Sequence, residues 1–326
     1  MANRIVLIVP YFGQFNSYYE FWLRSCQAND DLVDWLIFTD DKKILKKFNS
    51  EGRGNLKVYS FTLAEVKRLA EEKFGTAVAL EHAYKLCDLR PMYGLIFEDY
   101  LHEYEFWGEC DNDLIFGRMS HFLTSKILAS FDKILTRGHL TIYRNTPEVN
   151  NFFRQSERYD KIPSWRNVLS SPKGFSFDEW PGVSRLWHDL AKDKQYDGMV
   201  FDDILWTKKH FLSCQKQRFG IDQGKSHFIF EYDRGQLWRI YWDEQRQAVD
   251  REPTMYVHFQ KRNLKIETAD KDHYLVVPNA IIPYQDPSRE FVLHHGRKRY
   301  FYGQFYTEKW KIWKKRLKLW IRTHGY

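Results

Sequence analysis

The sequence lacks several features that would place it in a specialised structural class. No apolar run approaches the about 18 residues that a membrane-spanning helix requires, and the run Ile5–Pro10 lacks the basic flank and cleavage site of a signal peptide. The four cysteines are far apart, and none belongs to a Cys-x-x-Cys pair. This spacing argues against a cysteine zinc site or a disulfide scaffold and is typical of a protein in a reducing cytosol.

Motifs of several common enzyme classes are also missing. No Gly-x-Gly-x-x-Gly follows the first apolar run, so a nicotinamide-dinucleotide enzyme has no support, and there is no Gly-x-Ser-x-Gly elbow. The segment Gly220–Ser226 resembles a P-loop, but three residues separate its glycines and it leads into a strand-like run. A P-loop has four residues there and is followed by a helix N-terminus, so we reject this interpretation.

The positive charge is concentrated in one segment. The chain carries +7, but residues 297–326 hold ten Lys and Arg against one acid, so this tail carries +9 and the remainder −2. From about Thr307, apolar residues recur at helical spacing opposite a basic face. These apolar residues are Trp310, Trp313, Leu317, Trp320 and Ile321.

Tryptophan and basic residues on one helix suit the headgroup layer of an anionic membrane. We therefore expect residues 291–326 to form a basic, aromatic tail that binds the inner membrane surface. Its amphipathic C-terminal helix begins at about Thr307, and residues 291–303 form the hinge or first turn that leads into it. Two alternatives stay open for this helix: its tryptophans dock on the rest of the chain, or it binds nucleic acid, which we do not expect.

Apolar runs alternate with helical patterns along the first 110 residues. Residues 4–10, 35–39 and 56–60 read as buried strands, and 18–25 and 63–72 as helices. This alternation predicts an α/β fold with a mixed, mostly parallel sheet flanked by helices. Further strands are predicted at 105–110, 114–116, 139–143, 227–232, 237–242 and 254–259, and a helix from 147 to about 155.

The triplet Asp-x-Asp occurs twice. Asp270–Asp272 lies in a charged stretch and reads as an exposed turn, whereas Asp111-Asn112-Asp113 follows one apolar strand and precedes another. Two carboxylates at the end of a buried strand are stabilised by a hard divalent cation, which can bridge the phosphates of a nucleotide-sugar. A capped structural turn is the alternative.

Four blocks, taken together and in this order, resemble a known family. They are Pro10–Gly13, Trp35–Asp41, Tyr84–Gly94 and Phe106–Gly117. Over roughly residues 4–262 the chain resembles the GT-A-fold glycosyltransferases of bacterial capsule and O-antigen loci. The resemblance implies a GT-A-like catalytic domain at 1–290, with a nucleotide-sugar half at about 1–145 and an acceptor half at 146–290. The tail beyond residue 290 has no counterpart.

The resemblance also implies a metal site. Asp111 and Asp113 would hold Mn²⁺ or Mg²⁺, His258 would complete the metal shell, and Lys261 would contact the diphosphate. Imidazole suits Mn²⁺ better than Mg²⁺. The alternatives are that His258 is a hydrogen-bonded histidine at a strand end and that Lys261 is a solvated charge.

The donor nucleotide would lie beyond the first two strands. Pro10, Tyr11 and Phe12 follow the first strand, where this fold places the base, and Tyr11 would stack on or flank uracil. Asp40 or Asp41, at the end of the second strand, would bond the base or ribose, because open α/β sheets bind ligands beyond the carboxyl ends of their strands.

The block around residue 88 carries three further candidates. The resemblance aims Lys85, Asp88 and Arg90 at the donor sugar and phosphate. Lys85 and Asp88 are three residues apart on a helical stretch and therefore share a face. The alternative is that they form a buried ion pair that orients this helix.

On the acceptor side we single out Asp178 and Glu179, which lie among aromatic residues in a loop-rich stretch. Aromatic rings stack on sugar faces and carboxylates accept hydroxyl hydrogens. If the enzyme inverts configuration, one of these acids is the general base; if it retains configuration, which the late histidine favours, they orient the acceptor.

Asp202 and Asp203 read as an exposed helix face with ordinary charge pairing.

We thus expect a metal-dependent hexosyltransferase that moves galactose or glucose from a UDP-sugar to a lipid-linked surface polysaccharide. It would be cytoplasmic and peripheral on the inner face of the plasma membrane. The alternatives are a non-catalytic nucleotide-sugar-fold protein whose basic tail docks on nucleic acid or a partner, and a phosphotransferase that uses the same metal.

Overall fold

The structure of the chain is a computed structural model. It describes residues 5–49, 54–260, 262–297, 306, 307, 309–311, 313 and 314. The chain divides into two compact units that interleave along the sequence. The first unit comprises Met1–Phe15, Cys26–Asn112 and Met119–Gly198, and the second Asn16–Ser25, Asp113–Arg118 and Met199–Tyr326. The chain therefore passes from one unit to the other within the triplet Asp111-Asn112-Asp113.

A seven-stranded sheet forms the centre of the first unit, in the order β3-β2-β1-β4-β7-β6-β8. The four strands from β3 to β4 run parallel, β7 pairs antiparallel with β4 and β6, and β8 pairs parallel with β6. The strands are β1 (Ile5–Pro10), β2 (Val33–Thr39), β3 (Leu56–Ser60), β4 (Phe106–Cys110), β6 (Lys133–Ile134), β7 (Leu140–Arg144) and β8 (Gln195–Tyr196). The prediction of a mixed, mostly parallel sheet is confirmed.

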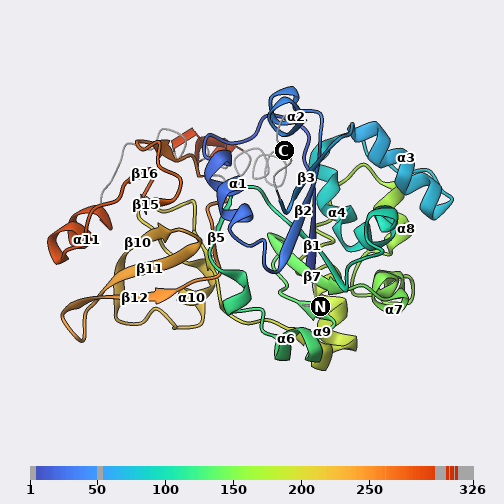
Figure 1. Cartoon of the computed structure of the whole chain (residues 1–326). Coiled ribbons are helices and arrows are strands. Elements are labelled where there is room, and N and C mark those ends of the chain that lie inside the picture. The colour runs from blue at the N-terminus through green and yellow to red at the C-terminus, as the bar shows by residue number, and fades with distance from the viewer. Residues whose placement is uncertain are drawn as a thin grey trace, which may run out of the picture. The chain divides into compact units, whose positions relative to one another are not determined.

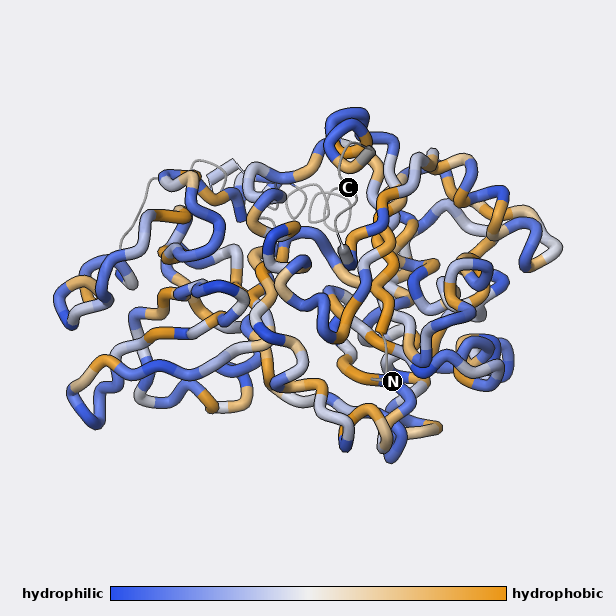
Figure 2. The backbone as a smooth tube through the Cα atoms, in the orientation of Figure 1, coloured by the Kyte–Doolittle hydropathy of each residue, from blue (hydrophilic) through white to orange (hydrophobic). Residues whose placement is uncertain are grey.

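The central strands are apolar on both faces because both are covered. Every residue of β2 is buried, and Figure 2 shows β1 and β2 largely in the hydrophobic colour. On one side of the sheet lie α3, α4, α7 and α8, whose Val66, Leu89 and Val149 share a core with Ile8 and Phe38 (Figure 1). The helices of this unit are α2 (Lys42–Asn49), α3 (Leu63–Phe74), α4 (Leu86–Leu89), α5 (Tyr93–Ile96), α6 (Ser125–Ser130), α7 (Pro147–Asn150), α8 (Trp165–Ser170) and α9 (Val183–Leu190).

The ends of α3 follow from its sequence. Thr62 and Glu65 form a capping box at its N-terminus, each side chain accepting from the other's backbone N–H. The helix ends at Gly75, whose left-handed φ of 62° a residue with a side chain rarely adopts. The predicted helix at 63–72 is confirmed. The predicted helix from residue 147 begins at Pro147 as α7 and continues as the 3₁₀ turns Phe152–Arg158.

The second unit contains two sheets. A six-stranded sheet has the order β12-β11-β10-β15-β16-β14, and a three-stranded sheet the order β5-β13-β9. The strands are β5 (Leu114–Phe116), β9 (Asp202–Asp203), β10 (Lys225–Asp233), β11 (Gln236–Asp243), β12 (Ala248–Pro253), β13 (Tyr256–His258), β14 (Lys265–Ile266), β15 (His273–Val277) and β16 (Ala280–Pro283). The strands predicted at 227–232 and 237–242 are β10 and β11, which pair antiparallel; β12, β15 and β16 lie outside our predictions.

Three further helices belong wholly or partly to the second unit. They are α1 (Tyr19–Gln27), α10 (Cys214–Arg218) and α11 (Arg289–His295), and α1 continues into the first unit at Cys26. The described residues between 306 and 314 are helical, as predicted for the start of the tail; the remainder of the predicted tail helix lies outside the described residues. Within the part of the chain that the structure describes, no helix has the length and apolar character that a membrane crossing requires.

Candidate functional site

The chain leaves the buried strand β4 at Asp111. All five residues of β4 are buried, and the strand pairs with β1 on one side and β7 on the other. The backbone N–H of Asp111 donates to the carbonyl of His139, at 3.0 Å. Because β1, β2 and β4 are parallel, the residues that follow them, Tyr11, Asp40 and Asp111, lie at the same edge of the sheet, where α/β sheets bind ligands.

Arg90 gathers three carboxylates in the first unit. Its guanidinium donates hydrogen bonds to the Asp111 carboxylate and to the carbonyl of Gly138. The same guanidinium lies 3.1 Å from Asp178 Oδ2 and 3.4 Å from Glu109 Oε2. We call Arg90, Glu109, Asp111 and Asp178 the Arg90 cluster. One cation faces three acids, so the cluster has an excess of negative charge when all are ionised.

The protonation of the cluster reflects this excess. Burial raises the pKa of Glu109 to about 8 and that of Asp178 to about 7, and the attraction of Arg90 only partly opposes the shift. Burial lowers the pKa of Arg90, but its three acids raise it more, so it lies well above its ordinary value. The two buried acids therefore change protonation near neutral pH, and the guanidinium stays charged.

The predicted acceptor acids lie beside Arg90. Asp178 is buried and Glu179 is half-buried, on a loop that packs against Gly138. A Cβ added to Gly138 would lie 3.2 Å from Glu179 Cβ and 3.3 Å from Asp178 Oδ2, and the glycine has a positive φ of 75°. Trp180 follows the two acids with 55% of its surface exposed. The sequence order thus places a buried acid, a half-buried acid and an exposed aromatic ring on one short loop.

Lys85 and Asp88 form the buried ion pair that we considered as the alternative to a donor-binding role. Their charged groups are 2.9 Å apart, and both side chains are almost fully buried. Asp88 also accepts from the backbone N–H groups of Phe175 and Phe177, and Lys85 donates to the carbonyl of Lys173, at 2.6 Å. The pair therefore fixes the loop that carries Asp178.

The residues predicted to surround the nucleotide base have the following positions. Pro10 ends β1, the Tyr11 ring packs at a tilt against Phe15 with ring centroids 4.5 Å apart, and Phe12 packs on the core of the first unit. The Asp40 side chain is exposed.

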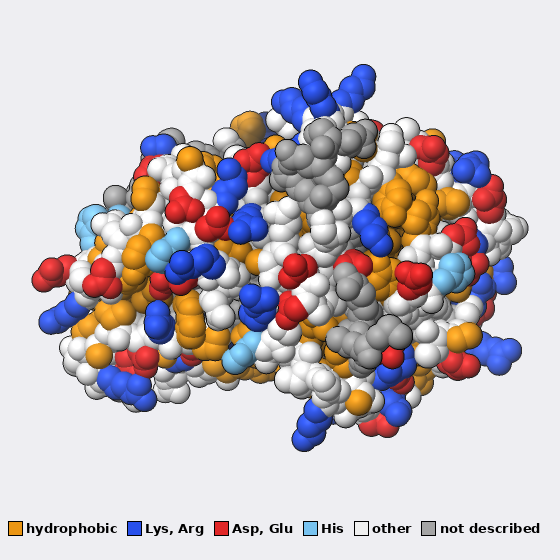
Figure 3. Space-filling model, viewed as in Figure 1, with side chains coloured by type: hydrophobic (Ala, Val, Ile, Leu, Met, Phe, Trp, Pro, Cys, Tyr) orange, Lys and Arg blue, Asp and Glu red, His pale blue; other side chains and the backbone are white. Residues whose placement is uncertain are grey.

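The Asp41 carboxylate caps a helix. It accepts from the backbone N–H of Lys43 at 2.8 Å and of Ile44 at 3.2 Å, so it caps α2. Figure 3 shows basic side chains gathered over the position of α2, which carries four lysines. Because the Asp41 carboxylate is engaged in this cap, we keep Asp40 as the candidate for a bond to the base or ribose.

In the second unit, His258 lies between two carboxylates. Its Nε2 is 3.2 Å from Asp113 Oδ1, and its Nδ1 is 2.9 Å from Asp203 Oδ1. We call Asp113, Asp203 and His258 the His258 triad. Strand pairing produces it, because β13 is antiparallel to β5, which Asp113 precedes, and parallel to β9, with His258 opposite Asp203. Burial lowers the pKa of His258, but the two carboxylates raise it well above its ordinary value.

The prediction for Asp202 and Asp203 is wrong. They form the strand β9, and both are buried rather than placed on an exposed helix face. Their partners come from distant parts of the chain, so the local sequence gives no sign of them. Asp203 faces His258, and Asp202 belongs to a separate network.

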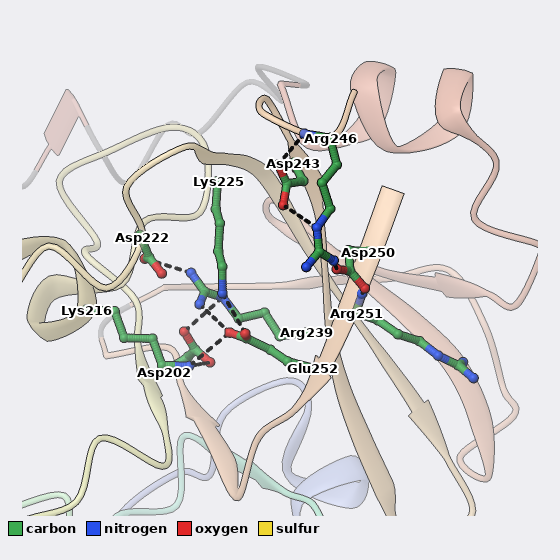
Figure 4. A network of polar contacts seen from close by, with 10 residues as sticks. All are labelled: Asp202, Lys216, Asp222, Lys225, Arg239, Asp243, Arg246, Asp250, Arg251 and Glu252. Carbon is green, nitrogen blue, oxygen red and sulfur yellow. Dashed lines mark hydrogen bonds and ion pairs between the residues drawn. The ribbon is translucent and has the colours of Figure 1, made fainter. Parts of the chain in front are cut away.

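Asp202 is held in a network of six alternating charges, of which Asp202, Lys216 and Arg239 are buried and the other three half-buried (Figure 4). Arg239 lies 3.2 Å from Asp202, 2.7 Å from Asp222 and 2.8 Å from Glu252. Lys216 lies 3.0 Å from Asp202, and Lys225 lies 2.6 Å from Glu252. We call these six residues the Arg239 network; its three acids match its three bases.

The residues present fit a divalent cation. Two ligand atoms bound at about 2.1 Å to an octahedral ion lie about 3 Å apart, and the separation of His258 Nε2 from Asp113 Oδ1 is 3.2 Å. Imidazole nitrogen with carboxylate oxygen is a donor set for Mn²⁺. Asp111 precedes Asp113 by two residues, so the chain itself limits the distance between their Cα atoms to about 7 Å.

Two residues of the site were not predicted from the sequence, and one predicted residue lies outside the described residues. Glu109 reads as part of an apolar strand, and its carboxylate pairs with Arg90, 19 positions earlier in the sequence. Asp203 is 55 positions from His258. Lys261, predicted to contact the diphosphate, is not among the described residues.

The sequence matches the model of a family of unknown function (DUF6625) over residues 7–285. Among curated proteins, none matches the chain significantly. Several solved structures are similar to this one, all at low identity.

Mouse xyloside xylosyltransferase 1 is 10% identical, with a TM-score of 0.37; the match covers 68% of this chain and 92% of that one. The glycosyltransferase GlyE of Streptococcus pneumoniae TIGR4 is 9% identical, with a TM-score of 0.38; the match covers 80% of this chain and 55% of that one. The galactosyltransferase LgtC, solved with donor and acceptor sugar analogues, is 9% identical, with a TM-score of 0.39; the match covers 78% of this chain and 86% of that one.

Proposed function

Since the chain belongs to a family of unknown function (DUF6625), we propose its function from the residues of the site. It is a metal-dependent glycosyltransferase that moves a hexose, galactose or glucose first, from a UDP-sugar to a lipid-linked bacterial surface polysaccharide. The observation that carries the proposal is the contact of Asp113 with His258, at 3.2 Å, directly after the buried strand β4, which ends at Cys110 and is followed by Asp111.

In this proposal Asp111, Asp113 and His258 hold Mn²⁺ or Mg²⁺. When bound, the cation neutralises the charge that develops on the leaving diphosphate. Arg90 holds Asp111 through its guanidinium and so limits the orientations that this carboxylate can take. Lys261 follows His258 closely in the sequence and is our candidate for a contact with the diphosphate.

The donor nucleotide lies beyond the carboxyl ends of β1 and β2 in our proposal. Pro10, Tyr11 and Phe12 follow β1 and contact the base, and Asp40 follows β2 and bonds the base or ribose. The Tyr11 ring is half-buried and packs on Phe15 at 4.5 Å, so its stacking surface is already oriented before the nucleotide binds.

The acceptor sugar lies at the loop of Asp178, Glu179 and Trp180. The exposed Trp180 ring offers an apolar face to a sugar ring, and Glu179 accepts hydroxyl hydrogens. Asp178 is ionised above about pH 7, which suits a group that accepts a hydrogen bond or a proton from an acceptor hydroxyl near neutral pH. We favour retention of configuration, in which these acids orient the acceptor.

A lipid-linked acceptor fits the properties of the tail. Trp310 and Trp313 are 54% and 57% exposed, and the Lys314 ammonium lies 3.7 Å from the centre of the Trp310 ring. Exposed tryptophans beside basic residues are typical of helices that lie in the headgroup layer of anionic membranes. We propose that the tail holds the enzyme on the inner membrane surface, where its acceptor is anchored.

Calorimetry of the full chain tests the proposal. UDP, GDP and CMP, then UDP-galactose and UDP-glucose, are titrated with and without Mn²⁺. We expect UDP and one UDP-hexose to bind only in the presence of Mn²⁺, with slow release of UDP from the bound donor. Binding of no nucleotide, or binding that is equal without metal, would contradict the proposal and favour a non-catalytic binding protein.

A further inference from the structure

The short strand β9 presents two acids to opposite sides. Neighbouring residues of a strand point to opposite faces: the Asp202 carboxylate contacts Arg239 and Lys216, whereas that of Asp203 contacts His258 Nδ1 at 2.9 Å. The first acid is satisfied by two bases, so it anchors the strand. The second is directed at an imidazole.

Asp203 is fixed from two directions. Its position opposite His258 in the β9–β13 pairing is held by the backbone N–H of Ile204, which donates to the His258 carbonyl at 2.8 Å. The Gln260 side-chain amide donates to the same Oδ1 that meets His258, at 2.8 Å. Both Asp203 and His258 are 8% exposed, so water competes little for these contacts.

Each imidazole nitrogen of His258 then faces a carboxylate. Asp203 faces Nδ1 and Asp113 faces Nε2. A carboxylate that accepts a hydrogen bond from one nitrogen of a metal-binding histidine fixes the tautomer and the ring orientation, and makes the other nitrogen a better ligand.

We propose that Asp203 is a positioning residue: it holds His258 with Nδ1 protonated and directs Nε2 to the divalent cation beside Asp113. This inference rests on the proposed metal site and adds to it a residue that does not itself bind the metal. Gln260 supports Asp203, and the Arg239 network holds the strand that carries it.

The second unit contains a matched control. His273 Nε2 lies 3.1 Å from Glu231 Oε1, also a histidine–carboxylate contact between two strands, here β15 and β10. It involves none of the proposed metal ligands. Glu231→Gln therefore removes a contact of the same chemistry without altering the His258 triad.

The test measures Mn²⁺ binding to the full chain, with and without UDP, by electron paramagnetic resonance of free Mn²⁺. A spin-echo measurement on the bound ion detects the nitrogen of a coordinating histidine, and His258→Gln assigns that signal. For Asp203→Asn we expect Mn²⁺ affinity to fall about 10–100-fold, with a weaker nitrogen signal. Gln260→Ala should show a smaller loss of the same kind, and Glu231→Gln should match the wild type.

Thermal unfolding of each variant accompanies the test. If Asp203→Asn fails to fold, Gln260→Ala, which leaves the carboxylate in place, decides the inference by the same two measurements. Wild-type affinity and nitrogen signal in the decisive variant would overturn the role of Asp203 and leave the proposed function intact. A wild-type protein that binds no Mn²⁺ with or without UDP would overturn both. Mn²⁺-dependent UDP binding without any histidine nitrogen signal would overturn the positioning role and the assignment of His258 as a ligand, and would leave metal-dependent UDP binding intact.

Discussion

The Arg90 cluster and the Arg239 network are two groups of buried and half-buried charges with opposite balance. Arg239, Lys216 and Lys225 oppose three acids in the second unit, whereas Arg90 alone opposes three acids in the first. The pKa values follow the balance. Burial raises the pKa of Asp202, but Arg239 and Lys216 lower it more, so it lies below its ordinary value; burial raises that of Asp178 to about 7.

The difference separates stabilising charges from charges available to a ligand. A balanced buried network satisfies its members internally, and removal of one partner leaves an uncompensated charge. A cluster with excess acid is stabilised by any further positive charge. Strongly shifted acids in such a cluster are typical of functional sites. The Arg239 network therefore supports the fold, and the Arg90 cluster lies where a cation is expected.

The largest effect is expected from Asp113→Asn, which tests the functional side of the comparison. Asparagine keeps the size of the side chain but removes the charge, so we expect Mn²⁺-dependent UDP release to fall by more than about 100-fold. Even loss of a group behind a metal ligand costs about 10–100-fold. UDP release is measured with a UDP-hexose and Mn²⁺, and folding by thermal unfolding.

The second Asp-x-Asp triplet provides the control. Asp270 caps a turn by accepting from the backbone N–H groups of Asp272 and His273, as we predicted for an exposed turn, and asparagine preserves that role. Asp270→Asn should therefore release UDP at the wild-type rate. Turnover by Asp113→Asn equal to that of the control would end the metal assignment.

The next largest effect is on stability, through Arg239→Met. The substitution leaves Asp202, Asp222 and Glu252 with less compensation, and breaking a buried pair costs about 3–5 kcal/mol. Urea unfolding measures the loss. Arg246→Met is the control, since Arg246 pairs with Asp250 at an exposed position (Figure 4) and should change stability by less than about 1 kcal/mol. Equal effects of the two variants would contradict a supporting role for the network.

A smaller, pH-dependent effect distinguishes the two groups directly. The pKa of Asp178 is about 7 in the folded chain, against 3.8 as its ordinary value. Between these values the folded state holds a proton that the unfolded state has released, so the stability contributed by Asp178 is full below about pH 4 and lost as pH rises through 7. Asp178→Asn should gain about 1–3 kcal/mol over the wild type at pH 8, and clearly less at pH 5, where only part of the loss has occurred.

The corresponding change in the balanced network has the opposite sign. The pKa of Asp202 is lowered, so its ionised form stabilises the fold above its ordinary pKa and the contribution is lost as pH falls. Asp202→Asn should therefore be less stable than the wild type at pH 8. Urea unfolding at pH 5, 6, 7 and 8 measures both variants, and a loss of stability in Asp178→Asn at pH 8 would contradict the charge excess of the Arg90 cluster.

Much of the first unit could be predicted from its sequence, because its strands are continuous apolar runs. The strand Leu56–Ser60 has the predicted bounds, and β1, Ile5–Pro10, begins one residue after the predicted start. The strands β12 and β15 of the second unit were missed. The residues of β12 are mostly half-buried or exposed and include Asp250, Arg251 and Glu252, so they carry no apolar signal.

The site was predictable only where neighbours along the chain make it. The triplet at 111–113 is recognisable, because two acids follow a buried strand directly. The contacts of Arg90 with Asp178, 88 positions apart, and of His258 with Asp203, 55 apart, depend on the loop and strand arrangement. A single sequence does not give strand pairing at that separation, and Asp202 and Asp203 were misassigned for that reason.

The smallest effect concerns the tail, whose basic residues we propose to act at an anionic membrane surface and not in the interior of the protein. Each basic residue near an anionic membrane contributes about 1 kcal/mol, so Lys314→Gln should weaken binding of the full chain to phosphatidylserine vesicles about fivefold at low salt. The Lys314 ammonium lies over the Trp310 ring. Trp310→Ala should further weaken vesicle binding, and this loss should persist at high salt because the contribution of the tryptophan ring is apolar. Vesicle sedimentation measures both. Lys192→Gln, an exposed lysine of the first unit, should bind as the wild type does. If Lys314→Gln binds as tightly as Lys192→Gln at every salt concentration, the tail is not held at the membrane by its charge.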